Sequence, residues 1–181
     1  KKGTGVEALL DIEFMMGVSP GVKTQFWEWP EMDFCGDLHK YTAALLSAAA
    51  PPLVNSISYG WQGALGLLNC KSADIKAVDA NWAKLAARGI SILISSGDTG
   101  SGYTVSPNLS DGDAAGEGDE KKHKFTLYPS WPASSPWVTA VGATRFIGQK
   151  QGGGEMASDQ FGSGGGFSKT FDQTDAKWQG G

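Results

Sequence analysis

Residues 92–102 read Ile-Leu-Ile-Ser-Ser-Gly-Asp-Thr-Gly-Ser-Gly, an apolar run that ends abruptly in small residues around one carboxylate. Such a run predicts a buried strand. Ligands of open parallel sheets bind beyond the carboxyl ends of the strands, so Asp98 stands where a reactive group would be placed. An Asp beside a glycine is equally typical of a tight turn, and the rest of the chain has to decide between these interpretations.

The segments around this run alternate between helical and extended patterns. Helices are predicted at residues 6–16, 37–50 and 72–88, with Ser72 as the N-cap of the last one. Strands are predicted at 22–29, 53–58, 90–96, 137–141 and 144–147, and an exposed polar insertion at 99–126. Strands that alternate with helices of this length indicate βαβ units. We therefore expect an α/β fold with a mostly parallel sheet flanked by helices.

The composition is that of a folded globular chain with an acidic balance. Of the 181 residues, 40% are hydrophobic and 19% are charged, and the formal net charge is −4. This balance argues against nucleic acid as a partner, because phosphate binding recruits Lys and Arg. No apolar run approaches the roughly 20 residues that a membrane span needs. The sequence therefore predicts neither nucleic acid binding nor a membrane span.

Two cysteines and one sequon bear on the cellular compartment. Cys35 and Cys70 permit one disulfide, and the alternative is a pair of reduced, packed thiols. Asn108 begins Asn-Leu-Ser, an acceptor pattern for N-glycosylation in a loop-like region. A bridge and a glycan would both favour a secretory route.

Glu7 and Asp11 are four residues apart on the first predicted helix, so they project from one face. The helix is otherwise apolar nearby, which favours burial. Two partly buried carboxylates at this spacing would share a proton, since joint ionisation is resisted. The alternative is a solvated acidic face near a helix N-terminus, where the helix dipole favours negative charge.

Other candidate motifs fit less well. Residues 98–101, Asp-Thr-Gly-Ser, also match the signature of pepsin-type aspartic proteases, but that chemistry needs two such aspartates and the motif occurs once. The predicted helices also conflict with an all-β fold, which leaves only a half-site homodimer for this alternative. The acidic residues at 111–120 miss the EF-hand pattern. Neither His39 nor His123 stands in a metal-site or triad pattern. The glycines at 164–166 favour close approach to an extended ligand over a phosphate loop.

Six segments follow one another along nearly the whole chain in the order of a known family. They are Glu-Ala-Leu-Leu-Asp-Ile at 7–12, Ser-Pro-Gly-Val-Lys at 19–23, Ser-Ile-Ser-Tyr-Gly at 56–60, Ser-Ser-Gly-Asp-Thr-Gly at 95–100, Tyr-Pro-Ser-Trp-Pro-Ala-Ser-Ser-Pro at 128–136 with Val-Gly-Ala-Thr at 141–144, and Ser-Gly-Gly-Gly-Phe-Ser at 163–168. Together they resemble the sedolisins, the serine-carboxyl peptidases, a family that includes tripeptidyl-peptidase I. The resemblance implies a subtilisin-like fold with acidic chemistry.

Carried over by position, the resemblance implies a role for each carboxyl group. Glu7 resembles the general base that deprotonates a serine nucleophile, Asp11 the residue that orients Glu7, and Asp98 the oxyanion stabiliser. A carboxyl group can donate a hydrogen bond to an oxyanion only when it is protonated, which predicts activity in acid. The resemblance also implies substrate contacts along both sides of the cleft, from Ser58, Tyr59, Gly60, Ser163, Gly164 and Gly165.

The chain departs from the family in one respect: it contains no Gly-Thr-Ser, the motif that carries the family's nucleophile. The family's calcium site lies in that same later region. Residues 1–181 are therefore expected to form a partial subtilisin-like peptidase domain. Ca²⁺ and the serine would be supplied outside this chain, by a second chain or a C-terminal segment, with no cofactor within residues 1–181. A propeptide and a peptide or protein substrate complete the expected partners.

Two questions stay open at this level. The first is whether the protein cuts internally or removes tripeptides. The second is whether it is a peptidase at all, because a catalytically inactive homologue kept for binding or structure is the alternative. Retention of Glu7, Asp11 and Asp98 together favours the peptidase. Acidic chemistry, the sequon and a disulfide would place it in a lysosome-like compartment or outside the cell.

Overall fold

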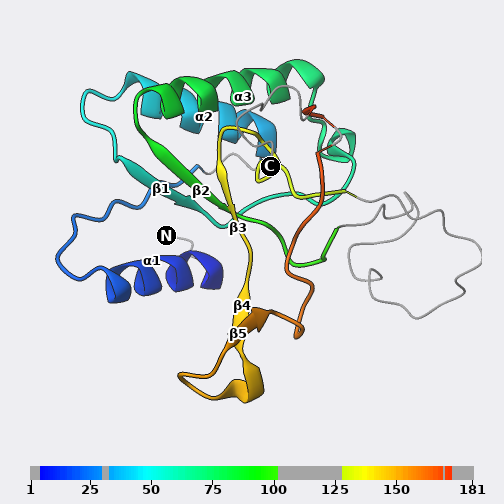
Figure 1. The fold of residues 1–181 in the computed structure, drawn as a ribbon. Helices are drawn as coiled ribbons and strands as arrows, with labels where there is room; N and C mark the ends of the chain where they lie inside the picture. The colour runs from blue at the N-terminus through cyan, green and yellow to red at the C-terminus, as the bar shows by residue number, and fades with distance from the viewer. Residues whose placement is uncertain (1–4, 30–32, 102–127, 169, 173–181) are drawn as a thin grey trace, which may run out of the picture.

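The computed structural model describes residues 5–29, 33–101, 128–168 and 170–172 (Figure 1). Its elements, in chain order, are α1 (Val6–Val18), α2 (Phe34–Ser47), β1 (Val54–Ile57), the short 3₁₀ helix η1 (Leu65–Leu68), α3 (Ser72–Ala87), β2 (Ser91–Ser95), β3 (Thr139–Val141), β4 (Thr144–Phe146), the 3₁₀ turn η2 (Ile147–Gln149) and β5 (Glu155–Ala157).

The central sheet has the order β1-β2-β3, and both pairings are parallel. Asn55 lies opposite Ile92 in the first pair, and Ile94 lies opposite Ala140 in the second. Helices α2 and α3 cover one face of the sheet, and α1 lies on the opposite side (Figure 1). The expected α/β class, with a parallel sheet flanked by helices, is confirmed.

The core lies between β2 and the helix pair α2 and α3. Ile92 and Ile94 of β2 are buried at alternate positions, as expected for a strand with one face against helices. From the helix side, Trp82 and Leu85 of α3 and Leu45 of α2 are completely buried. Burying each such side chain contributes about 1.5–3 kcal/mol, so this layer fixes β2 firmly in place.

Two side-chain hydrogen bonds cross this layer, whereas the buried indole N–H of Trp82 has no partner among the described residues. The buried Asn81 amide donates to the Thr42 hydroxyl at 3.0 Å, which links α3 to α2. The Tyr41 hydroxyl donates to Asn55 Oδ1 at 2.9 Å, which links α2 to β1. Burial raises the pKa of Tyr41, which keeps the phenol protonated as a donor.

Two local predictions need correction, and a third lies mostly outside the described residues. Residues 22–29 contain no strand; instead Trp27 and Trp29 stack on each other and meet Tyr41 edge-on, so aromatic packing replaces strand pairing. Lys71, not Ser72, is the N-cap of α3, because the Asp74 carboxylate accepts from the Lys71 N–H at 3.2 Å. Most of the predicted insertion at 99–126, including Asn108, lies outside the described residues.

Strand β5 was missed in the sequence, where its start falls in a glycine-rich turn. It pairs antiparallel with β4 in a separate two-stranded sheet. Arg145 of β4 donates to the Asp159 carboxylate just beyond β5, and this hydrogen bond lowers the pKa of Asp159. The pair is exposed and contributes little to stability.

Helix α1 differs from α2 and α3 because none of its residues is buried. Val6, Phe14 and Val18 are 86%, 67% and 81% exposed. The expectation that apolar neighbours bury this helix is therefore not met by the residues described. Within those residues, no helix combines the length and the hydropathy needed to cross a bilayer.

A disulfide joins Cys35, at the start of α2, to Cys70, just before α3, with a Cα–Cα distance of 5.6 Å. Both residues lie in the core. We expect neither thiol to react with an alkylating reagent until the native protein is reduced, a result that peptide mass spectrometry reads directly. Replacing both cysteines with Ala should lower the free energy of unfolding by about 3–4 kcal/mol, given the 35-residue separation. Labelling without reductant would contradict the bridge.

The glycine-rich segment at 162–165 crosses the carboxyl end of β2 at close range. A Cβ atom on Gly164 would overlap the Ser96 carbonyl, whereas a Cβ on Gly165 would meet nothing within 4 Å. We expect Gly164→Ala to cost about 1–3 kcal/mol in unfolding free energy, and Gly165→Ala to cost much less. Thermal denaturation of the two variants checks this matched pair, and equal melting temperatures would contradict the crossing.

Candidate active site

The carboxyl edge of the parallel sheet gathers three of the predicted segments. Asp98 follows β2, Ser58 to Gly60 follow β1, and the register places Ile57 of β1 beside Ile94 of β2. The two strands therefore end at the same edge of the sheet. The third segment, at 162–165, approaches this edge from further along the sequence.

The turn that carries Asp98 is defined by backbone conformations that favour glycine. Gly97 has φ +100° and Gly100 has φ +57°, both in the region that L side chains rarely adopt. Asp98 itself is exposed, and its carboxylate makes no hydrogen bond or ion pair within the described residues. The turn thus exposes the Asp98 carboxyl group to solvent, and the two glycines determine the conformation of the backbone on either side of it.

Backbone hydrogen bonds hold the segment at 162–165 against this turn. The Gly164 N–H donates to the Gly97 carbonyl at 2.8 Å, and the Gly100 N–H donates to the Gly162 carbonyl at 2.8 Å. The Gly165 N–H donates to the Gly100 carbonyl at 3.0 Å. The structure therefore brings the predicted cleft-lining glycines to Asp98.

The Ser163 side chain makes a structural hydrogen bond in addition to its predicted place in the cleft. Its hydroxyl oxygen accepts a hydrogen bond from the Ala143 N–H at 2.8 Å. Ala143 lies in the link between β3 and β4. In this structure Ser163 ties its segment to the end of β3, and substrate contact through this residue stays a prediction.

Residues 58–60 leave the sheet as an extended segment. Tyr59 is 60% exposed and Gly60 is exposed. A Cβ on Gly60 would overlap the Ser130 hydroxyl, so the chain passes close to residues 130–131 there. Beyond Gly60, Trp61 forms a two-hydrogen-bond bridge with Trp131, at 2.8 and 3.0 Å. This bridge fixes where the extended segment ends.

Glu7 and Asp11 make no hydrogen bond or ion pair with this assembly among the described residues. Both are on α1, where Glu7 is exposed and Asp11 is half-buried. Within the described residues, no hydrogen bond or ion pair joins either carboxylate to the turn at 97–100. The predicted base and its partner are thus on a helix in which no residue is buried.

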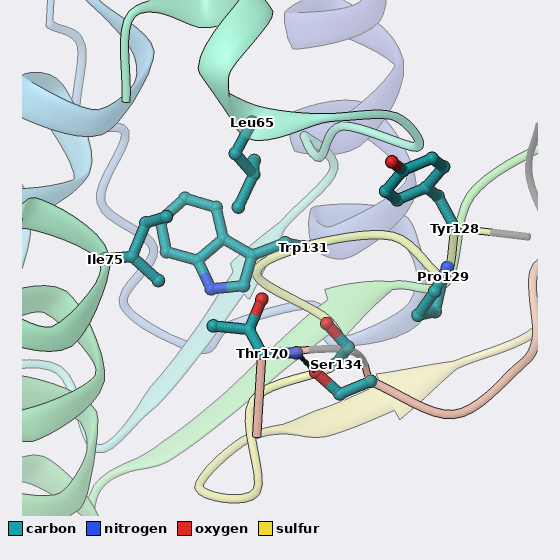
Figure 2. Close-up of a pocket in the computed structure, with 8 residues that line it drawn as sticks. Leu65, Ile75, Tyr128, Pro129, Trp131, Ser134 and Thr170 are labelled. Atoms are coloured by element: carbon teal, nitrogen blue, oxygen red, sulfur yellow. Dashed lines mark hydrogen bonds between the residues drawn. The ribbon is translucent and has the colours of Figure 1, made fainter. Parts of the chain in front are cut away.

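A cavity of about 130 Å³ lies next to Trp131, one of the two residues of this bridge (Figure 2). It is lined by Leu65, Ile75, Tyr128, Pro129, Trp131, Ser134, Ser168 and Thr170. The Ser168 hydroxyl accepts from the Thr170 and Phe171 N–H groups at 3.1 Å each. Among the residues that the structure describes, no carboxylate or imidazole lines the cavity, so these residues offer Ser168 no general base.

Gln62 is a residue at this edge that the sequence analysis did not single out. Its side chain contacts the turn at 97–100 through four hydrogen bonds. No pattern in the sequence marks it, because a single Gln in a loop has no periodicity and no characteristic spacing. Only the tertiary structure shows what it touches.

The chain is similar in sequence to known peptidases. Tripeptidyl-peptidase 1 of Canis lupus familiaris is 34% identical over 171 residues, 93% of this chain, and the Homo sapiens protein is 33% identical over 169 residues. The chain spans 26% of the length of these relatives. The solved structure of Pseudomonas sedolisin, a serine-carboxyl proteinase complexed with two molecules of pseudo-iodotyrostatin, superposes at a TM-score of 0.42 and 24% identity, covering 75% of this chain and 34% of that one. No family model matches.

The relatives match 92–93% of the chain. The predicted α/β architecture is also present. The chain belongs to the sedolisin family of serine-carboxyl peptidases.

Proposed function

We propose that this chain is part of an acid-acting serine-carboxyl peptidase that hydrolyses peptide bonds. The observation that carries the proposal is the convergence at one sheet edge of Asp98, the extended segment at 58–60 and the glycines at 162–165. Together they offer a hydrogen-bonding carboxyl group beside two stretches of accessible backbone. The name of the relatives, tripeptidyl-peptidase 1, favours removal of tripeptides over internal cleavage.

In the proposed reaction, the nucleophile is the serine of a Gly-Thr-Ser segment outside residues 1–181. Glu7 takes the proton from this serine as it attacks the scissile carbonyl, and Asp11 orients Glu7. Protonated Asp98 donates a hydrogen bond to the oxyanion of the tetrahedral intermediate. Such a donor acts where negative charge develops, and one oxyanion-hole donor is worth about 10²–10³ in kcat. Glu7 then returns its proton to the leaving amine.

The substrate is proposed to bind as an additional strand. Strand β1 is at one edge of the three-stranded sheet, and residues 58–60 continue beyond its last paired residue. Backbone at such an edge can pair with an extended peptide. Gly164 and Gly165, which have no side chains, would leave room for the peptide on the other side of Asp98.

We propose three further components of the active peptidase. They are a second chain or C-terminal segment with the serine, a propeptide, and Ca²⁺ bound outside residues 1–181. Among the described residues, no group of three or more His, Cys, Asp or Glu side chains gathers to hold a metal ion. We assign no catalytic step to calcium. Acid-dependent chemistry favours a lysosome-like compartment or secretion.

The base role is tested by Glu7→Gln in the complete protein. The amide cannot accept the serine proton, so turnover of a peptide substrate at acid pH should fall by roughly 100-fold or more. Glu13→Gln, an exposed substitution on the same helix, is the matched control and should leave turnover unchanged. Near wild-type turnover in Glu7→Gln would remove Glu7 from the mechanism.

The oxyanion role is tested by Asp98→Asn. The Asn amide donates a hydrogen bond at any pH, whereas the Asp carboxyl donates only when it is protonated. Residual activity of the variant should therefore lose much of its dependence on acid, as measured by kcat/KM from pH 3 to pH 8. An unchanged pH profile would count against this role for Asp98.

The alternative, an inactive homologue kept for binding or structure, is separated by one measurement. The intact mass of the native material under reducing, denaturing conditions, with sequencing of any companion chain, shows whether a Gly-Thr-Ser serine is present. Its absence would favour the inactive homologue. A half-site aspartic protease would instead be inhibited by pepstatin and be insensitive to serine-directed aldehydes.

A further inference from the structure

We propose that Gln62 is a positioning residue that sets the orientation of Asp98. The inference rests on the proposed oxyanion role of Asp98, and it adds a residue on which that role depends. Gln62 lies four residues beyond Ser58, on the segment that leaves β1, and Asp98 lies at the end of β2. A single amide side chain therefore couples the proposed substrate-binding segment to the proposed oxyanion donor.

The amide of Gln62 contacts both halves of the turn. Its Oε1 atom accepts from the N–H of Asp98 at 3.0 Å, the N–H of Thr99 at 3.1 Å and the hydroxyl of Thr99 at 2.7 Å. Its Nε2 atom donates to the Gly100 carbonyl at 3.0 Å. The acceptor and the donor are both used; an ionised carboxylate of this length lacks the donor, and an apolar side chain lacks both.

Gly97 makes this contact possible. A Cβ atom at this position would overlap Gln62 Oε1, and the residue also has φ +100°. The glycine therefore serves two purposes, since it turns the chain after β2 and leaves room for the amide. With Oε1 seated there, the N–H groups of Asp98 and Thr99 both point at one atom, which fixes the peptide planes on each side of the Asp98 Cα.

The core holds Gln62 itself in place. Its neighbour Trp61 is bridged to Trp131 by two backbone hydrogen bonds, and Trp131 is 3% exposed. On the other side of the turn, the glycines at 162–165 supply three backbone hydrogen bonds. Asp98 is thus held from two sides while its own side chain stays exposed. Removing the Gln62 contacts leaves only one of these two supports.

The experiment compares Gln62→Met with Gln62→Glu in the complete, active protein. Met keeps the length of the side chain and removes both polar atoms, whereas Glu keeps an acceptor for Asp98 and Thr99 and loses the donor to Gly100. Gln151→Met, at an exposed position in the glycine-rich turn before β5, is the matched control. The measurements are amide hydrogen exchange at Asp98 and Thr99, and kcat and KM for a peptide substrate.

We expect Gln62→Met to speed exchange at Asp98 and Thr99 by about tenfold or more. It should also lower kcat by about tenfold or more, with KM within twofold, because a misplaced donor weakens transition-state stabilisation more than substrate binding. Gln62→Glu should retain most of the exchange protection, and Gln151→Met should match the wild type in every measurement.

Hydrogen exchange separates a failure of this inference from a failure of the proposed function. Unchanged exchange in Gln62→Met, or equal loss of protection in Gln62→Met and Gln62→Glu, overturns the role of Gln62 whatever the activity. Faster exchange with unchanged kcat shows that the orientation of Asp98 does not matter to the reaction, and it overturns the coupling to catalysis. If Gln62→Met does not fold, Gln62→Glu remains decisive, because the proposal requires it to stay protected.

Discussion

The packing of β2 against α2 and α3 determines the position of everything at the carboxyl edge of the sheet. Ile92 and Ile94 are buried in the same core as Trp82 and Leu85. The strand pairs with β1 at residues 91–94 and with β3 at residues 93–95. A strand held by two ladders and a core cannot shift by one residue without turning its apolar face away from the helices. The turn at Asp98 therefore starts from a fixed point.

From that point, the chain builds a support for one exposed carboxyl group. Gln62 contacts the turn from the β1 side, and the glycines at 162–165 contact it from the β3 side. Gln62 supplies four hydrogen bonds through its side chain and the glycine segment supplies three between backbone groups, and the glycines let the main chains approach closely. The arrangement fixes the backbone of Asp98 and leaves its carboxyl free to meet a ligand, as a preorganised electrostatic group requires.

Helix α1 presents the opposite case. Its sequence has apolar residues at helical spacing, and the helix forms, yet none of its residues is buried. Glu7 and Asp11 lie on a common face of this helix. Among the described residues, no hydrogen bond or ion pair links either carboxylate to Asp98. The proposed base, Glu7, and the proposed oxyanion donor, Asp98, must lie at a defined distance from each other to act on one substrate. That distance depends on how α1 packs.

The sequence by itself determined the α/β class, the existence of all three helices and of β1 to β4, and the family. These follow from local periodicity, from breakers such as Gly89, and from six motifs in order, which need no knowledge of distant contacts. It placed Asp98 at the end of a strand because an apolar run followed by small residues has that meaning in a parallel sheet. It failed at 22–29 and at β5, where pairing partners, and not local propensity, decide whether a strand forms.

Only the tertiary structure decided what touches Asp98. The contacts of Gln62 and of Gly164 span 36 and 67 positions in the chain, and no local pattern encodes which loop meets which turn. The same holds for the disulfide, since two cysteines allow a bridge but only the packing of α2 beside α3 brings their Cα atoms to 5.6 Å. The local sequence determines where helices and strands form. The burial of side chains from distant segments determines which ends of these helices and strands come together.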